Sequence, residues 1–293
     1  MNKTRLLKAA PVIEQQVQAL KKRADQLRKK DVIPRLDVFL VGNNPASVLY
    51  TNKKREFCQR IGAQCNIIKL DEQISTSDFL AKVKTSAENN DVHGMLIQLP
   101  LPKPLQSLDV ATLVPAKKDV DGFHPENIFK LYSQNKDAFS TFLKPCTPQG
   151  IMELLGHYHI EVANKNVLIM GRSAIVGKPA ALMALAYDAT VTISHSHTQN
   201  LKSLCHQADI IISATGRSEA YGAEYLRESA DQVLIDVGIN KNSAGKTCGD
   251  WKHSELQEKL AAYTPVPGGV GPMTVLALVQ NLLQATENQL KEK

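Results

Sequence analysis

The chain has 293 residues, of which 43% are hydrophobic, so it is long enough to bury a sizeable core and is not disordered. Its apolar runs are short and interrupted, and no apolar segment of signal-peptide length follows the basic start, which argues against a membrane-spanning helix or a secretion signal. Five scattered cysteines without a C-x-x-C pair indicate reduced thiols, so we expect a cytoplasmic protein.

The formal net charge is +6, and the densest basic stretch lies between residues 21 and 30 on an amphipathic helix pattern. A solvated helix face explains this stretch. Nucleic-acid binding is disfavoured because no aromatic residues are interleaved with the charge. A basic surface would also suit a polyanionic small molecule.

Helix and strand patterns alternate through the first part of the chain. They predict helices over residues 12–30, 46–61 and 77–88 and strands over 36–41, 65–70 and 95–97. Gly62 is suited to close the second helix. This βαβαβ order predicts a mostly parallel sheet.

The segments LPLPKPL (99–105) and KDVDGFHPEN (118–127) interrupt the alternation, which resumes at Pro148. Further strands are predicted over 166–170, 190–193, 209–212 and 232–236. The interruption places a domain boundary between residues 140 and 148.

The second region contains a turn that is suited to phosphate. GRSAIVGKP (171–179) joins a predicted strand to a predicted helix, where backbone N–H groups and the helix dipole favour an anion. The spacing differs from G-x-G-x-x-G, so an ordinary turn between strand and helix is an equal alternative.

The end of the next strand bears on the type of dinucleotide. NAD enzymes usually carry Asp or Glu there for the ribose 2′-hydroxyl, whereas this chain reads Ile193-Ser-His-Ser-His197. Arg172, with Ser196 and His197, could instead hold a 2′-phosphate, which predicts NADP. His195 and His197 are expected to alternate along the strand, but a metal site lacks a third ligand nearby.

The first region carries candidate reactive groups on one helix. Ser47, Tyr50 and Lys54 follow helical spacing and share a face. A phenol can pack against a flat heterocycle while an amine transfers a proton, provided that burial or neighbouring charge lowers the pKa of the amine. A solvated helix lysine is the alternative.

Two further polar sites follow the third strand. Gln98 lies at its carboxyl end, where parallel sheets present functional groups. Asp119 and Asp121 lie in KDVDG, which could form an Asx turn, a cation loop or an acceptor for an amino-pyrimidine ring.

Eight motifs now occur together in order: SVLYTNKK, GMLIQLPLP, KDVDGFHPEN, PCTPQGI, GRSAIVGKP, ATVTISHS, IDVGIN and TPVPGGVGPMT. Over residues 36–281 the chain resembles the bifunctional methylenetetrahydrofolate dehydrogenase/cyclohydrolase family. The resemblance implies NADP-dependent oxidation of methylenetetrahydrofolate and hydrolysis of the methenyl product to formyltetrahydrofolate, without a metal.

The resemblance also implies roles for single residues. Lys54 would be the acid–base residue, with Tyr50 packing on the folate, Gln98 hydrogen-bonded to Lys54 and Asp121 anchoring the pterin. Gly171, Arg172 and Ser173 would hold the cofactor, with Ser196 at its 2′-phosphate and Ile239 beside it.

The implied fold is α/β, with two domains flanking a cleft and a homodimeric assembly. Residues 1–143 and 274–293 would form the folate domain, and 144–273 a Rossmann-like NADP domain. Pro267, Gly268 and Gly269 would line the cleft as a stiff, bare backbone beside the folate, before a helix that begins near Met273.

The chain departs from the family pattern at three positions. Phe129 stands where the family commonly has glycine, Ser229 replaces a glycine before a strand, and Trp251 follows Gly249-Asp250. These positions lie in loops outside the proposed catalytic set. Three alternatives stay open: a dehydrogenase whose cyclohydrolase step is weak or absent, an NADP-dependent dehydrogenase of another metabolite, and a folate- or nucleotide-binding regulator, which only Phe129 supports.

Overall fold

The computed structural model describes residues 4–291, which divide into two compact units. The three-stranded unit comprises Glu14–Ser133, Asp137–Cys146 and the chain from Val275 onward. The six-stranded unit comprises the chain up to Ile13, Gln134–Lys136 and Thr147–Thr274. Helices α1 (Ala9–Arg28) and α9 (Val270–Lys291) each contribute residues to both units.

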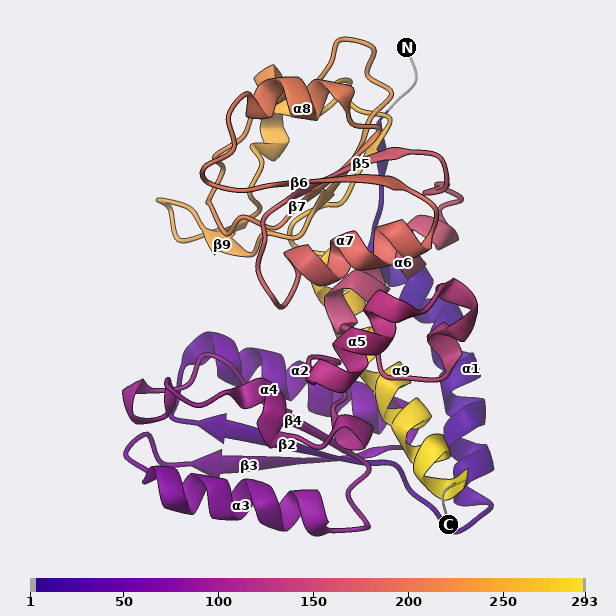
Figure 1. The fold of residues 1–293 in the computed structure, drawn as a ribbon, viewed down its shortest axis with the longest axis vertical. Coiled ribbons are helices and arrows are strands. Elements are labelled where there is room, and N and C mark those ends of the chain that lie inside the picture. Colours follow the sequence, from indigo (N-terminus) through magenta and orange to yellow (C-terminus); the bar gives the residue numbers. More distant parts are fainter. Residues whose placement is uncertain (1–3, 292–293) are drawn as a thin grey trace. The chain divides into compact units, whose positions relative to one another are not determined.

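The three-stranded unit is built on a parallel sheet of order β3-β2-β4 (Figure 1). Its strands and main helices are β2 (Arg35–Val41), α2 (Pro45–Ile61), β3 (Gln64–Leu70), α3 (Thr76–Glu88) and β4 (Gly94–Ile97). These elements confirm the predicted alternation to within a residue or two at each end. The short helices α4 (Val110–Leu113) and α5 (Pro125–Ser133) follow, and the sequence analysis assigned neither.

Side chains of β2 alternate between two buried faces of this sheet. Phe39 and Val41 share a cluster with Phe79 of α3, and the rings of Phe39 and Phe79 meet edge to face with centroids 6.3 Å apart. Residues i and i+2 of a strand point to the same face, so Leu36, Val38 and Leu40 lie on the other. Burial on both faces explains why this strand is a continuous apolar run.

The six-stranded unit is a parallel sheet of order β1-β11-β8-β7-β5-β6. The strands are β1 (Arg5–Leu6), β5 (Asn166–Met170), β6 (Thr190–Ser194), β7 (Ile210–Ser213), β8 (Val233–Asp236) and β11 (Ala262–Tyr263). The helices are α6 (Cys146–His157), α7 (Gly177–Ala186) and α8 (Leu201–Gln207), and β9 (Asn240–Lys241) and β10 (Thr247–Cys248) form a separate antiparallel pair. Residues up to Ile13 belong to this unit because β1 pairs with β11, whereas the sequence analysis placed them in the folate domain.

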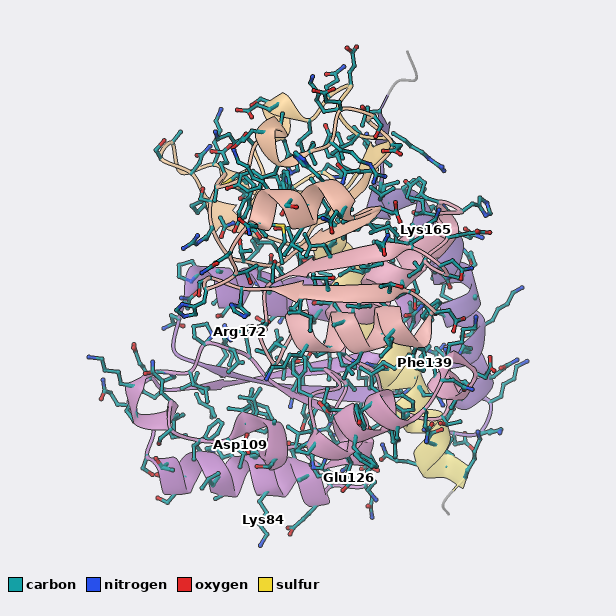
Figure 2. All side chains as sticks on the ribbon, turned by 45° about the horizontal axis from the view of Figure 1, so that its top comes forward. Lys84, Asp109, Glu126, Phe139, Lys165 and Arg172 are labelled. Carbon is teal, nitrogen blue, oxygen red and sulfur yellow. The ribbon has the colours of Figure 1, made fainter. Side chains whose placement is uncertain are left out.

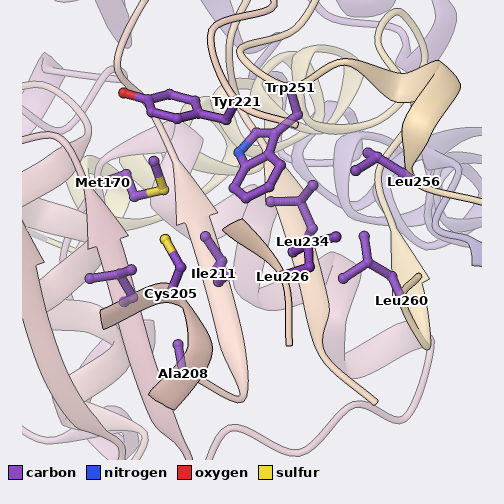
Figure 3. Close-up of a cluster of buried hydrophobic side chains, with 11 residues drawn as sticks. Met170, Cys205, Ala208, Ile211, Tyr221, Leu226, Leu234, Trp251, Leu256 and Leu260 are labelled. Carbon is purple, nitrogen blue, oxygen red and sulfur yellow. The ribbon is translucent and has the colours of Figure 1, made fainter. Parts of the chain in front are cut away.

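A buried cluster fixes one side of the six-stranded unit (Figure 3). Trp251 is 0% exposed at its centre, and its ring centroid lies 5.7 Å from that of Tyr221. Met170 at the end of β5 and Leu234 of β8 belong to the same cluster. The departure at Trp251 therefore supplies core volume, because an aromatic side chain buries a large apolar area.

Candidate active site and cofactor pocket

Helix α2 carries the candidate acid–base residue on its buried face. Asn44 caps the helix by accepting hydrogen bonds from the N–H groups of Ala46 (3.0 Å) and Ser47 (3.2 Å), and Gly62 closes it with φ 83°. The buried positions recur at helical spacing: Ser47, Thr51, Lys54, Cys58 and Ile61. Lys54 is 8% exposed, so the solvated-lysine alternative is wrong for this residue.

Lys54 and Gln98 form a direct hydrogen bond. The Lys54 ammonium Nζ donates to Gln98 Oε1 at 3.0 Å, as the family resemblance implies. Gln98 follows β4, and its backbone N–H bonds the Phe39 carbonyl at 2.9 Å, which continues the sheet by one residue. Its Nε2 donates to the Leu99 carbonyl at 2.8 Å, so the amide is oriented with its oxygen toward the lysine.

Tyr50 lies one helical turn before Lys54 and is half-buried. Burial raises the pKa of its phenol, so the ring remains neutral at physiological pH. Lys53 Nζ lies 5.7 Å from the centroid of this ring, within cation–π range. Tyr50 therefore offers a neutral aromatic surface with a polar edge beside the buried amine.

The two aspartates of KDVDG have different environments. Asp119 is buried and accepts hydrogen bonds from the N–H groups of Gly122 (3.1 Å) and His124 (2.7 Å) and from Asn127 Nδ2 (3.1 Å). Burial raises the pKa of Asp119 to about 6 despite these donors. Asp119 is thus the residue that forms the turn, as one of the sequence-based alternatives expected.

The carboxylate of Asp121 makes no hydrogen bond within the described residues. Burial raises the pKa of Asp121, and the nearby positive charge of Lys54 partly opposes this rise. A half-buried acceptor without an internal donor, close to a buried amine, is suited to receive hydrogen bonds from a ligand.

A residue far along the chain secures the loop that carries Asp121. Asn281 of α9 donates from Nδ2 to the carbonyls of Val120 (2.8 Å) and Lys144 (2.7 Å). The Cys146 N–H donates to the Asp121 carbonyl at 3.2 Å. Gly122 has φ 76°, and a Cβ there would lie 2.2 Å from the Lys144 carbonyl carbon, so the two segments touch through bare backbone.

The turn between β5 and α7 carries Arg172, which is labelled in Figure 2. Ser173 Oγ accepts from the N–H groups of Val176 (3.1 Å) and Gly177 (3.2 Å), which satisfies donors at the helix start. A Cβ on Gly177 would lie 2.2 Å from the Gly171 carbonyl oxygen. A Cβ on Gly171 would lie 2.5 Å from the Ala214 carbonyl oxygen, so the close approach of the backbone requires both glycines.

This turn borders a pocket of about 370 Å³ within the six-stranded unit. Gly171, Arg172, Ser173 and Ser196, four of the five predicted cofactor residues, line it. Its other lining residues are Met170, Ser194, His195, Thr198, Leu201, Ala214, Thr215, Arg217, Tyr221 and Tyr225. The lining contains no carboxylate, which suits an anionic ligand.

One expectation at the edge of this pocket was wrong. Strand β6 ends at Ser194, so His195 and His197 lie in a turn and not on the strand. The His195 N–H donates to Thr198 Oγ1 at 2.9 Å and the His197 N–H to His195 Nδ1 at 3.2 Å, bonds that replace a sheet ladder. Ile239, the fifth predicted cofactor residue, is 51% exposed and lies outside this lining, so its place beside the cofactor stays a prediction.

Pro267, Gly268 and Gly269 form a turn before α9, which begins at Val270 and not near Met273. The helix can start earlier because Pro272 falls in its first turn. Backbone N–H groups in the first turn have no intrahelical acceptor, so the N–H that proline lacks is not missed there. A Cβ on Gly269 would lie 2.7 Å from the Pro265 carbonyl oxygen. Gly268 has φ 104°, and its carbonyl accepts from the Ala9 N–H at 2.9 Å.

Sequence analysis missed several lining residues, above all Thr215 and Arg217. Both follow β7, and the rule that drew attention to Gln98 at a strand end would have found them as well. Phe129, by contrast, is 64% exposed on α5 beside Tyr132 and does not fill the loop after Asp121. The regulator alternative therefore loses its support.

The pocket residues fit a dinucleotide. The buried hydroxyl of Thr215 has no hydrogen-bond partner within the described residues, and the Arg172 guanidinium has no ion pair there. Both groups are free to bind phosphate or ribose oxygens. Among residues 4–291 no group of three or more His, Cys, Asp or Glu is placed to hold a metal ion, and no helix is long and apolar enough to cross a membrane.

Comparison with known proteins defines the class of protein to which the chain belongs. Residues 7–121 match the family description "Tetrahydrofolate dehydrogenase/cyclohydrolase, catalytic domain". Residues 145–290 match "Tetrahydrofolate dehydrogenase/cyclohydrolase, NAD(P)-binding domain". The site in the three-stranded unit thus belongs to a catalytic domain, and the pocket to an NAD(P)-binding domain.

Individual relatives agree with this class. The chain is 42% identical over 282 residues to "Bifunctional protein FolD" of Oceanobacillus iheyensis, covering 96% of each chain, and 43% identical over 272 residues to that of Lysinibacillus sphaericus, covering 93% of each. The chain belongs to the tetrahydrofolate dehydrogenase/cyclohydrolase family and is a bifunctional enzyme of one-carbon folate metabolism.

Solved structures share the fold. The bifunctional FolD enzyme from Campylobacter jejuni superposes with a TM-score of 0.91 at 36% identity, covering 97% of this chain and 99% of that one. The Trypanosoma brucei enzyme, described as complexed with NADP cofactor and inhibitor, gives a TM-score of 0.91 at 27% identity, covering 99% and 100%. These matches confirm the two-domain α/β fold expected from sequence.

Proposed function

We propose that the protein oxidises 5,10-methylenetetrahydrofolate with NADP⁺ and hydrolyses the 5,10-methenyl product to 10-formyltetrahydrofolate, with Lys54 as the acid–base residue. The observation that carries the assignment is the Lys54–Gln98 hydrogen bond on the buried face of α2. A buried amine that is held by one neutral acceptor can exchange protons with a bound substrate without competition from a carboxylate partner.

The hydrolytic step gives each group of the three-stranded unit a task. Water adds to the cationic methenyl carbon and loses one proton to solvent, and the ring opens when the remaining hydroxyl proton passes to the departing nitrogen. Lys54 would carry this proton, while Gln98 fixes the position of the amine. Tyr50 would pack against the folate, and Asp121 would accept hydrogen bonds from its amino-pyrimidine ring.

The six-stranded unit would hold the cofactor. Gly171 and Ser173 shape the turn before α7, where the helix N-terminus favours the pyrophosphate. Arg172 and Ser196 would bind the 2′-phosphate, since the pocket lining supplies no carboxylate for a ribose 2′-hydroxyl. NADP⁺, when bound, accepts the hydride from the folate carbon.

The test is a direct assay of the purified protein. Methylenetetrahydrofolate is mixed with NADP⁺ or NAD⁺ and near-ultraviolet absorbance is followed; the product is then acidified to distinguish formyl from methenyl forms. We expect reduction of NADP⁺ with formyl product. Methenyl product that accumulates without hydrolysis would remove the role given to Lys54, and a preference for NAD⁺ would remove the 2′-phosphate assignment.

A further inference from the structure

We infer that Arg217 is a second 2′-phosphate ligand and, with Arg172, determines the preference for NADP over NAD. The inference rests on the proposed NADP-dependent activity and adds a residue from a separate strand. Arg172 follows β5, whereas Arg217 follows β7, the strand that lies next to β5 in the sheet. Both line the same pocket of about 370 Å³.

The charge balance of the pocket favours a group with more than one negative charge. Its lining holds two guanidinium groups and no carboxylate. Within residues 4–291 neither Arg172 nor Arg217 takes part in an ion pair. A phosphate monoester carries roughly −1.5 to −2 charges at neutral pH, and each guanidinium matches its oxygens with a fork of donors.

The loop that carries Arg217 is fixed from behind. Asp250 is 0% exposed and accepts hydrogen bonds from the N–H groups of Thr215 (2.7 Å) and Arg217 (3.1 Å). It also accepts from Ser213 Oγ (2.9 Å) and Asn240 Nδ2 (3.0 Å). These donors engage both oxygens of the carboxylate, so it holds the backbone of Arg217 and leaves the guanidinium available to a ligand.

A second feature of the same loop indicates a ligand. The buried Thr215 hydroxyl lines the pocket two residues before Arg217 and has no partner among the described residues. Buried hydroxyls are normally hydrogen-bonded. The loop therefore presents one unpaired hydroxyl and one unpaired cation to the space that Arg172 borders from β5.

Stacking of Arg217 on the adenine is the competing role, and the pocket already provides aromatic surfaces for that base. Tyr225 lines it and is only partly buried, and its ring is held edge to face by the buried Tyr221, with centroids 5.3 Å apart. Stacking would affect NADP⁺ and NAD⁺ equally, because both contain adenine. A 2′-phosphate contact affects NADP⁺ alone, so the two roles separate in one experiment.

The experiment measures binding of two adenosine fragments to the full-length protein. Adenosine 2′,5′-bisphosphate contains the 2′-phosphate, and adenosine 5′-monophosphate lacks it. Calorimetric dissociation constants are compared for the wild type, Arg217→Gln, Arg172→Gln and the exposed-surface control Lys246→Gln. We expect Arg217→Gln to weaken the bisphosphate by about ten- to a hundred-fold and to leave the monophosphate unchanged, the loss typical of a charge-assisted hydrogen bond.

Equal weakening of both fragments would overturn the inference in favour of adenine or 5′-phosphate contact, and no weakening of either would remove Arg217 from the site. Fluorescence of Trp251, the single tryptophan, checks that Arg217→Gln remains folded. Turnover separates the two proposals. If the wild type does not reduce NADP⁺, the proposed function fails. If it does, and Arg217→Gln binds the bisphosphate as tightly as the wild type, the inference alone fails.

Discussion

The two units prepare their functional groups in different ways. In the three-stranded unit, side chains hold the reacting groups: Gln98 bonds Lys54, and Asn281 secures the loop of Asp121. In the six-stranded unit, backbone contacts shape the pocket, while the arginines that border it have no ion pair among the described residues.

This difference follows from what each site must do. Proton transfer requires atoms held within a fraction of an ångström, and side-chain hydrogen bonds provide that precision before the substrate arrives. A dinucleotide is bound mainly through its phosphates and ribose, so bare backbone and unpaired cations serve better. Substitution of positioning side chains should therefore damage the first site, whereas added backbone bulk or loss of an unpaired cation should damage the second.

The largest effect is expected from Lys54→Met. Loss of a general acid–base group typically reduces rate by about 10²- to 10⁴-fold, and we expect a decrease of this size in cyclohydrolase activity. Hydride transfer should survive in part, because it requires alignment more than proton transfer. Rates of methenyltetrahydrofolate hydrolysis and NADP⁺ reduction are compared with those of the exposed Lys82→Met control; equal loss of both activities would contradict the assigned role.

A backbone test in the six-stranded unit uses two glycines. A Cβ on Gly177 would lie 2.2 Å from the Gly171 carbonyl oxygen, whereas a Cβ on Gly156 of α6 would meet nothing within 4 Å. Gly177→Ala should lower the free energy of unfolding by about 1–3 kcal/mol and raise the KM for NADP⁺. Gly156→Ala, the matched control, should raise that free energy by up to about 1 kcal/mol.

Denaturant unfolding and steady-state kinetics measure both variants. Similar free energies of unfolding for Gly177→Ala and Gly156→Ala would show that the turn accommodates a Cβ at position 177. The proposal that the cofactor site depends on tight backbone packing would then be abandoned. Unchanged folate kinetics in both variants would place the effect in the cofactor site.

The next effect concerns Asn281, which holds the loop that carries Asp121. Asn281→Leu keeps the size of the side chain but leaves the carbonyls of Val120 and Lys144 without their donor. An unsatisfied buried polar group costs about 1–3 kcal/mol, so we expect the KM for folate to rise about tenfold with a smaller change in kcat. Asn281→Asp should raise the KM for folate further, because a carboxylate then faces two carbonyl oxygens.

Asn288→Leu, on the same helix, is the control for Asn281. The dissociation constant for NADP⁺ should stay unchanged in all three variants. A uniform loss of folate and NADP⁺ binding would indicate general destabilisation and would deny Asn281 a positioning role.

The sequence predicted what depends on local pattern. The elements from β2 to β4 have strong periodicity and clear end signals, so they were found nearly residue for residue. Lys54 and Gln98 were found because helix spacing and the end of a strand are local features. Strands β1 and β11 have two residues each, and their pairing depends on segments that lie more than 250 residues apart.

Residues that hold other groups in position were not predicted from the sequence, for the same physical reason. Asn281 acts on a loop that is 161 residues away, and Asp250 acts on one 33 to 37 residues away. Asn281 and Asp250 work where distant segments meet, which periodicity and spacing do not encode. Helix α5 is different: Pro125 at its first position and Glu126 in its first turn are local start signals, which the sequence analysis passed over because KDVDGFHPEN was taken as a turn.

The smallest expected effect is a pH dependence of folate binding that originates in Asp121. The ionised carboxylate is the form that accepts hydrogen bonds from the pterin, and burial raises the pKa of Asp121 above its ordinary value of 3.8. As pH falls toward this raised pKa, the protonated fraction grows, so folate affinity should fall at pH values where an exposed carboxylate would still be ionised. Asp121→Asn should bind folate weakly with little pH dependence.

Calorimetric titration with tetrahydrofolate between pH 5 and 8 measures both proteins, and NADP⁺ titrations of the same samples control for acid effects on the other unit. A wild-type affinity that stays constant over this range, or an Asp121→Asn variant that retains the full slope, would assign the dependence to another group and leave Asp121 as a loop residue.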